Sequence, residues 1–165
     1  MDRYPVLILT TGGTLDKVHD LVREALVFDR EAGSCVPHIL AQARAEFPRV
    51  QPLMWLDSLD MIDADRKHIA EAIAAAEEDR IVVIHGTGTM GLTARYLAPL
   101  VVDKTVVLTG AMRPHSLGRS DAGFNLGGAL VAAQLCEPGV WGVMNGRVFA
   151  ADDLEKNRTT GRFDA

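Results

Sequence analysis

Three threonines and one lysine have side chains suited to nucleophilic chemistry. Thr14, Thr87 and Thr89 lie beside glycines in short polar stretches. A threonine hydroxyl is a weak nucleophile unless a base lies within hydrogen-bond reach. Lys156 is a candidate base if burial lowers the pKa of its ammonium group. The backbone N–H groups of an oxyanion hole would come from nearby glycines, namely Gly12, Gly13, Gly86 and Gly88.

These residues follow short apolar runs bounded by glycine, a pattern typical of buried parallel strands. Four such strand ends carry glycine, hydroxyl or carboxylate residues, at Thr10, Asp57, His85 and Thr109. Parallel strands place all four ends on one edge of a sheet, where ligands bind in open α/β folds. The sequence therefore predicts a site at that edge. His85, which has no evident partner, is expected only to pack.

Strands alternate with helical patterns along the whole chain, which predicts a mostly parallel sheet with helices on both faces. The turn Asn145-Gly146 between apolar runs is a strong hairpin signal. Asp63 is a plausible N-cap. The expected strands are 6–9, 50–56, 80–84, 105–108, 140–144 and 147–150. The expected helices are 37–47, 63–76, a segment ending near 97, and 122–135. We expect 15–34 to form a long loop or lid, and 152–165 to form a polar tail with little packing.

Composition and charge narrow the class of protein. The chain has 165 residues, which suits one domain, and a net charge of -5 with no basic block, which argues against nucleic acid as a partner. No apolar stretch of about 18 residues predicts a membrane span, and no signal peptide is visible. Cys35 and Cys136 form no CxxC and are expected to be buried and reduced in a cytoplasmic protein. The scattered histidines predict no metal site, and no cofactor is expected.

A nucleotide-binding alternative rests on the same glycines. Residues 86–91 match G-x-G-x-x-G between a strand and a helix, the context of dinucleotide-binding loops. That fingerprint also requires a carboxylate after the next strand, which here ends in Leu108-Thr109-Gly110. This alternative therefore remains the weaker one.

Taken together, the motifs resemble the bacterial L-asparaginases, the threonine amidohydrolases. The matching stretches occur in the family's order and cover nearly the whole chain: 11–15, 85–90, 106–114, 120–126 and 143–156. The resemblance is to the N-terminal domain alone, so we expect a single domain over 1–165 and no C-terminal domain. It implies an α/β three-layer sandwich with a mostly parallel, flavodoxin-like sheet and a C-terminal β-hairpin. The exposed sheet edge and the family both suggest a homo-oligomer, a dimer or a tetramer.

The resemblance also implies a mechanism and a small-molecule substrate, asparagine or a related amide. Thr14 would attack the side-chain amide carbon. Thr87 and Lys156 would form a second constellation, in which the lysine accepts a proton and Thr87 also helps to hold the oxyanion. Ser58 would bind the substrate α-carboxylate, and Ala111 would offer a backbone contact. The remaining substrate-binding residues would be Gly13, Asp57, Asp60, Gly86 and Gly88, with His19 nearest to the lid position.

Three features depart from the family pattern. Gly88 stands where the family has an aspartate that binds the substrate α-ammonium, and Leu59 replaces a polar residue. The family's lid tyrosine is also replaced, by His19 or Phe28. A second hypothesis is therefore an asparaginase-like domain with little asparaginase activity, acting on another small amide or as a binding module.

Overall fold

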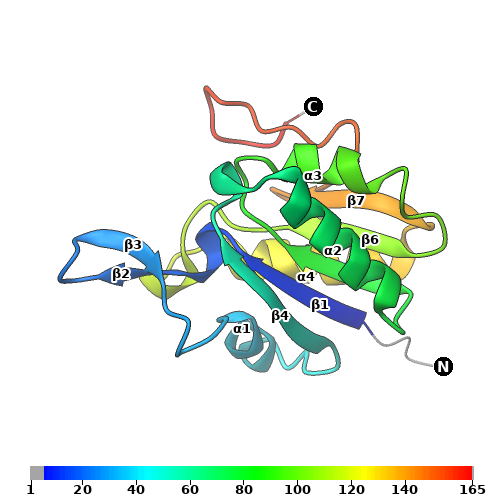
Figure 1. The fold of residues 1–165 in the computed structure, drawn as a ribbon. Helices are drawn as coiled ribbons and strands as arrows, with labels where there is room; N and C mark the ends of the chain where they lie inside the picture. The colour runs from blue at the N-terminus through cyan, green and yellow to red at the C-terminus, as the bar shows by residue number, and fades with distance from the viewer. Residues whose placement is uncertain (1–5, 165) are drawn as a thin grey trace.

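A six-stranded sheet forms the centre of the computed structural model, which describes residues 6–164 (Figure 1). Its strand order is β4-β1-β5-β6-β7-β8, and only the β7–β8 pair is antiparallel. Counted along the sheet's own strands, the parallel part has the order 2-1-3-4-5 of flavodoxin-like folds. The strands are β1 (Val6–Gly12), β4 (Arg49–Leu56), β5 (Arg80–Ile84), β6 (Thr105–Thr109), β7 (Gly139–Met144) and β8 (Arg147–Ala150).

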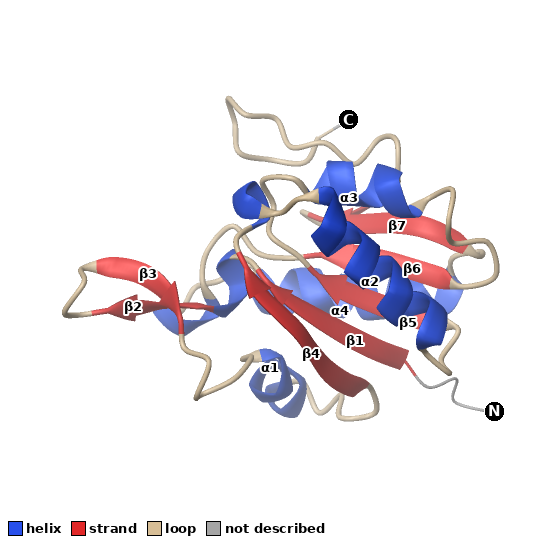
Figure 2. Ribbon diagram, viewed as in Figure 1, coloured by secondary structure: helices blue, strands red, loops and turns tan. Residues whose placement is uncertain are grey.

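Four α-helices cover the two faces of this sheet, which gives the predicted three layers (Figure 2). Successive residues of β1 point to opposite faces. Leu7 and Leu9 pack in the cluster of α2 and α3, while Val6 and Ile8 pack in that of α1 and α4. The helices are α1 (Val36–Gln42), α2 (Asp63–Ala75), α3 (Met90–Leu97) and α4 (Ala122–Leu135), with 3₁₀ helices at Thr14–Asp16, Ser58–Asp60 and His115–Leu117. None of the helices between residues 6 and 164 is long and apolar enough to cross a membrane.

Two helix boundaries differ from the prediction. α1 ends at Gln42 instead of residue 47, because the chain reverses at Arg44, whose φ is 54°. Asp63 is the first residue of α2 and not its N-cap. Ile62 is the N-cap residue, and the carboxylate of Asp65 accepts its backbone N–H at 2.9 Å.

The stretch 15–34 is not the irregular loop that we expected. It contains a two-stranded antiparallel hairpin, β2 (Lys17–Asp20) and β3 (Ala25–Phe28), in which Lys17 pairs with Phe28. The Asp20 carboxylate accepts the N–H groups of the turn between the strands. Figure 1 shows the hairpin projecting away from the central sheet.

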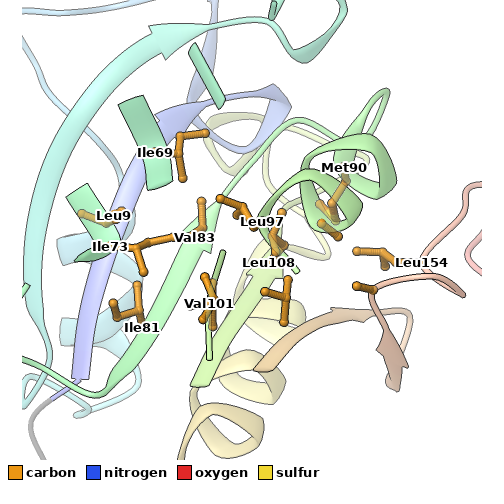
Figure 3. Packing of buried hydrophobic residues seen from close by; sticks show 14 of the residues in the cluster. Leu9, Ile69, Ile73, Ile81, Val83, Met90, Leu97, Val101, Leu108 and Leu154 are labelled. Carbon is orange, nitrogen blue, oxygen red and sulfur yellow. The ribbon is translucent and has the colours of Figure 1, made fainter. Parts of the chain in front are cut away.

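The C-terminal segment packs against the domain, so the expectation of an unpacked polar tail is wrong for its described part. Leu154 and Phe163 are buried in the same apolar cluster as α2 and α3. Figure 3 shows Leu154 at the side of the cluster next to Met90. Phe163 also donates its backbone N–H to Asn145 at 2.8 Å. Because the segment is held at both ends, Lys156 between them has a defined position.

Cys35 and Cys136 are free thiols, as predicted, but both are half-buried instead of buried. Burial raises the pKa of the Cys35 thiol strongly, and the neighbouring Asp16 carboxylate adds to that effect. Thiolate is the reactive form of cysteine. Cys35 is therefore poorly suited to act as a nucleophile.

Candidate active site

Two glycine turns meet where β1 and β5 end side by side. A Cβ atom added to Gly13 would lie 2.6 Å from the backbone nitrogen of Gly86. Gly13 also has a φ of 76°, which side-chain-bearing residues rarely adopt. Its N–H donates to the Leu56 carbonyl of β4 at 3.0 Å. Glycine at this position thus brings the ends of β1, β4 and β5 together, as the sequence predicted.

Ser58 fixes the turn after β4 against the turn after β5. Its hydroxyl oxygen accepts the N–H of Gly88 at 3.1 Å, and its carbonyl accepts the hydroxyl of Thr89 at 2.7 Å. A Cβ atom at Gly86 would lie 2.6 Å from the same hydroxyl oxygen. Ser58 is buried, so this contact is shielded from solvent. Four of the predicted site residues, Gly13, Ser58, Gly86 and Gly88, therefore form one connected group.

Thr87 lies within this group and is hydrogen-bonded to Lys156. The lysine Nζ donates to the Thr87 hydroxyl oxygen at 3.1 Å. The C-terminal segment can pass close to α3 because position 91 is glycine: a Cβ there would lie 2.0 Å from the Leu154 carbonyl oxygen. The third glycine of the G-x-G-x-x-G pattern thus accommodates the chain's own backbone.

Thr14 begins the 3₁₀ helix that follows Gly13. It is half-buried between the buried Gly13 and Leu15. Within residues 6–164, no hydrogen bond joins its hydroxyl to a basic side chain. The structure thus places Thr14 next to the joined glycine turns without a base in contact.

Asp57 forms an ion pair with Lys17, a residue that sequence reasoning missed. The lysine Nζ bonds to one carboxylate oxygen of Asp57, and the other accepts the N–H of Leu59 at 3.0 Å. The Lys17 hydrogen bond, followed by that of Leu59, lowers the pKa of Asp57. Lys17 Nζ also lies 5.6 Å from the centroid of the Phe28 ring. The only sequence signal was a basic residue three positions after Thr14, which is common on any surface.

Three further predicted residues, Asp60, Ala111 and His19, have no side-chain hydrogen bond to Thr87 or Lys156 among the described residues. Asp60 is exposed on the 3₁₀ helix after β4. Ala111 is buried just after Gly110, where a Cβ would lie 2.2 Å from the His85 carbonyl oxygen. His19 is exposed on β2, opposite Leu26 in the projecting hairpin. The structure therefore does not bring His19 to the joined turns.

His85 ends β5 and is completely buried beneath the site. Its Nδ1 lies 2.7 Å from the Gly86 carbonyl oxygen, and its Nε2 lies 2.8 Å from the Thr93 hydroxyl. Arg66 donates to the same hydroxyl at 3.1 Å. Burial lowers the pKa of His85 to about 4, so the imidazole is neutral at physiological pH. His85 therefore does more than pack, which is all that the sequence led us to expect, because both of its ring nitrogens have polar partners that hold the turn.

Comparison with known proteins agrees with this arrangement. The family model for the N-terminal part of asparaginase matches residues 5–165. L-asparaginase 2 of Escherichia coli is 33% identical over 166 residues, which are 94% of this chain and 47% of that protein. L-asparaginase 1 of the same organism is 40% identical over 119 residues, 69% of this chain and 34% of that protein.

Solved structures give the same result. L-asparaginase I from Vibrio cholerae superposes with a TM-score of 0.76 at 29% identity, over 97% of this chain and 50% of that one. The L-asparaginase from Thermococcus kodakarensis gives 0.75 at 27% identity, over 89% and 46% of the two chains. The chain thus spans about half the length of the relatives and structures that match nearly all of it. It belongs to the asparaginase family and corresponds to that family's N-terminal region.

Proposed function

We propose that the chain is an amidohydrolase that converts L-asparagine to L-aspartate and ammonia through a threonine acyl-enzyme. The observation that carries the proposal is the Lys156–Thr87 hydrogen bond of 3.1 Å beside the joined glycine turns. Lys156 supplies a basic group, Thr87 supplies a hydroxyl, and the glycine turns supply backbone N–H donors at the same edge of the sheet. Membership of the asparaginase family supports the same chemistry.

In the proposed reaction, the Thr14 oxygen attacks the side-chain amide carbon, and its proton passes to the substrate's nitrogen. Backbone N–H groups of the glycine turns stabilise the negative oxygen of the tetrahedral intermediate. The C–N bond then breaks, ammonia leaves and an ester remains on Thr14. Water attacks this ester and passes a proton through Thr87 to Lys156, the proposed proton acceptor, and aspartate leaves as the threonine hydroxyl is restored.

Ser58 would bind the substrate carboxylate. Its oxygen already accepts the Gly88 N–H, so its own hydrogen is available to a ligand. Asp57, Asp60 and the backbone at Ala111 would complete the pocket. A dimer or tetramer remains our prediction for the assembly.

Ammonia release from asparagine tests this function. We expect release by the purified chain, none above background for Thr14→Ala, and partial activity for Thr14→Ser, which keeps the hydroxyl. The control is Thr159→Ala, since Thr159 is exposed on the C-terminal segment. Equal release by the parent and Thr14→Ala would contradict the assigned nucleophile. Failure to release ammonia from any small amide would contradict the amidohydrolase assignment.

A further inference from the structure

An apolar side chain occupies the space beside the predicted carboxylate-binding serine. A Cβ atom at Gly88 would lie 2.7 Å from Leu59 Cδ2 and 3.1 Å from Ser58 Oγ. Leu59 is 75% exposed, so it lies at the surface around this group and is not part of the core. The end of the Leu59 side chain therefore lies in the space that a side chain at position 88 would enter, and it would have to turn aside to admit one.

One carboxylate contacts the turn that carries Ser58 and Leu59. Asp57 is paired with Lys17 and accepts the Leu59 N–H. Asp16 is buried; its Oδ1 accepts hydrogen bonds from Ser34 and Cys35, and its Oδ2 has no partner among the described residues. Asp60 is exposed at the end of the 3₁₀ helix. Among the described residues, no carboxylate is hydrogen-bonded to Gly88 or to the Ser58 hydroxyl.

The cationic groups, in contrast, lie close by. Lys156 contacts Thr87, and its charge also contributes to the lowered pKa of Asp57. Asp57 contacts Lys17 directly and also feels the charge of Lys156. Such a balance attracts a carboxylate and disfavours a further ammonium group.

Building on the proposed function, we infer that the preferred substrate is a small monoamide of a dicarboxylic acid with no ammonium group beside its carboxylate. Ser58 and Lys17 would receive the carboxylate of such a compound. Leu59 would contact the methylene that replaces the aminated carbon. An asparagine ammonium group would be placed near Leu59 and Lys17, with its own hydrogen-bonding capacity unmet.

The reaction itself is unchanged for such a substrate. The C–N bond of the terminal amide breaks, one water is consumed, and the products are ammonia and a dicarboxylate. Succinamate is the matched probe, because it differs from asparagine only in lacking the α-amino group.

The first measurement compares kcat/KM for ammonia release from succinamate and from asparagine. We expect a preference for succinamate of about 10- to 100-fold, the range for leaving one charged donor unpaired. A preference for asparagine, or equal values, would overturn the inference while leaving the amidohydrolase function intact. Equal values would mean that Asp57 breaks its ion pair with Lys17 and binds the substrate ammonium group instead.

A double variant tests whether positions 59 and 88 set this preference. Leu59→Ala with Gly88→Asp opens the space and adds a carboxylate there. We expect the ratio of kcat/KM values to shift toward asparagine by at least about tenfold, whereas Leu59→Ala alone keeps the preference for succinamate. An unchanged ratio in the double variant, with the fold intact by circular dichroism, would contradict the role of these positions.

Binding of the two dicarboxylate products separates the inference from catalysis. Calorimetric titration with succinate and with aspartate needs no turnover. Tighter binding of succinate supports the inference even if neither amide is hydrolysed, in which case only the proposed function fails. Tighter or equal binding of aspartate, or no binding of either product, would overturn the inference.

Discussion

Lys156 donates a hydrogen bond to Thr87 at 3.1 Å although 69 positions separate them in the chain. The contact depends on the C-terminal segment returning across the start of α3. Leu154 holds that segment from one side, and Phe163 holds it from the other through Asn145. The packing of the C-terminal segment is thus what places a basic group at the end of β5.

Replacing Lys156 should reduce turnover much more than stability. Lys156→Met keeps an unbranched chain of similar length but has no proton acceptor. We expect kcat to fall by at least about 100-fold, in line with the loss of a general base, with little change in the unfolding midpoint. Lys67→Met is the control, because Lys67 is exposed on α2, where it forms an ion pair with Glu71. Unchanged kcat in Lys156→Met would contradict the proton-acceptor role.

Gly91→Ala should destabilise the domain and lower its activity. The new Cβ would lie 2.0 Å from the Leu154 carbonyl oxygen, which belongs to backbone and cannot rotate away. We expect a loss of about 1–3 kcal/mol in the free energy of unfolding, typical of overpacking. Gly127→Ala is a matched control within a helix, since nothing lies within 4 Å of its Cβ position. There, alanine should stabilise the helix by up to about 1 kcal/mol. Equal effects of the two changes in urea unfolding would contradict the close approach at Gly91.

Leu154→Ala tests whether the C-terminal segment belongs to the core. The Leu154 side chain is completely buried and lies against Gly142, where a Cβ would be 2.4 Å away. Truncation should lower the free energy of unfolding by about 2–5 kcal/mol, as at other buried leucines. Leu135→Ala, at a side chain that is 76% exposed, should have a much smaller effect. If both variants unfold at the same urea concentration, the segment does not contribute to the core.

His85 should make stability fall as the pH falls below about 6.5. Its pKa is about 4 in the folded state and about 6.5 when exposed, so the unfolded state binds more protons between these values. Above pH 6.5 the imidazole is neutral in both states, so His85 does not change the free energy of unfolding there. Between pH 7 and pH 5 the parent should lose about 2 kcal/mol more than His85→Gln, which cannot be protonated. Titration of the His85 imidazole near pH 6.5 in the folded protein, followed by NMR, would contradict this.

The architecture was largely predictable because its signals are local. Apolar runs ending in glycine located the strands of the sheet, and the turn at Asn145-Gly146 located the β7–β8 hairpin. The meeting of the glycine turns followed from parallel topology, which places strand ends at one edge. That reasoning predicted that the strand ends at Thr10, Asp57 and His85 lie close together, whereas the role of Ser58 came from the family resemblance.

Long-range packing accounts for what was missed. Leu154 and Phe163 are isolated apolar residues in a polar stretch, so no periodicity marked them as core. The Lys17–Asp57 ion pair joins residues 40 positions apart, and Lys17 belongs to the β2–β3 hairpin, where the sequence predicts a loop. α1 ends before the predicted residue because Arg44 turns the chain with a positive φ. The spacing of apolar residues does not reveal such a backbone conformation.

Trapping the acyl-enzyme tests the central claim most directly. The chain would be mixed with succinamate or asparagine, quenched in acid during turnover, digested and analysed by mass spectrometry. We predict that the peptide containing Thr14 carries the substrate's acyl group as an ester, and that Thr14→Ala yields no modified peptide. An ester on Thr87, or steady ammonia release with no ester on any peptide, would contradict the mechanism.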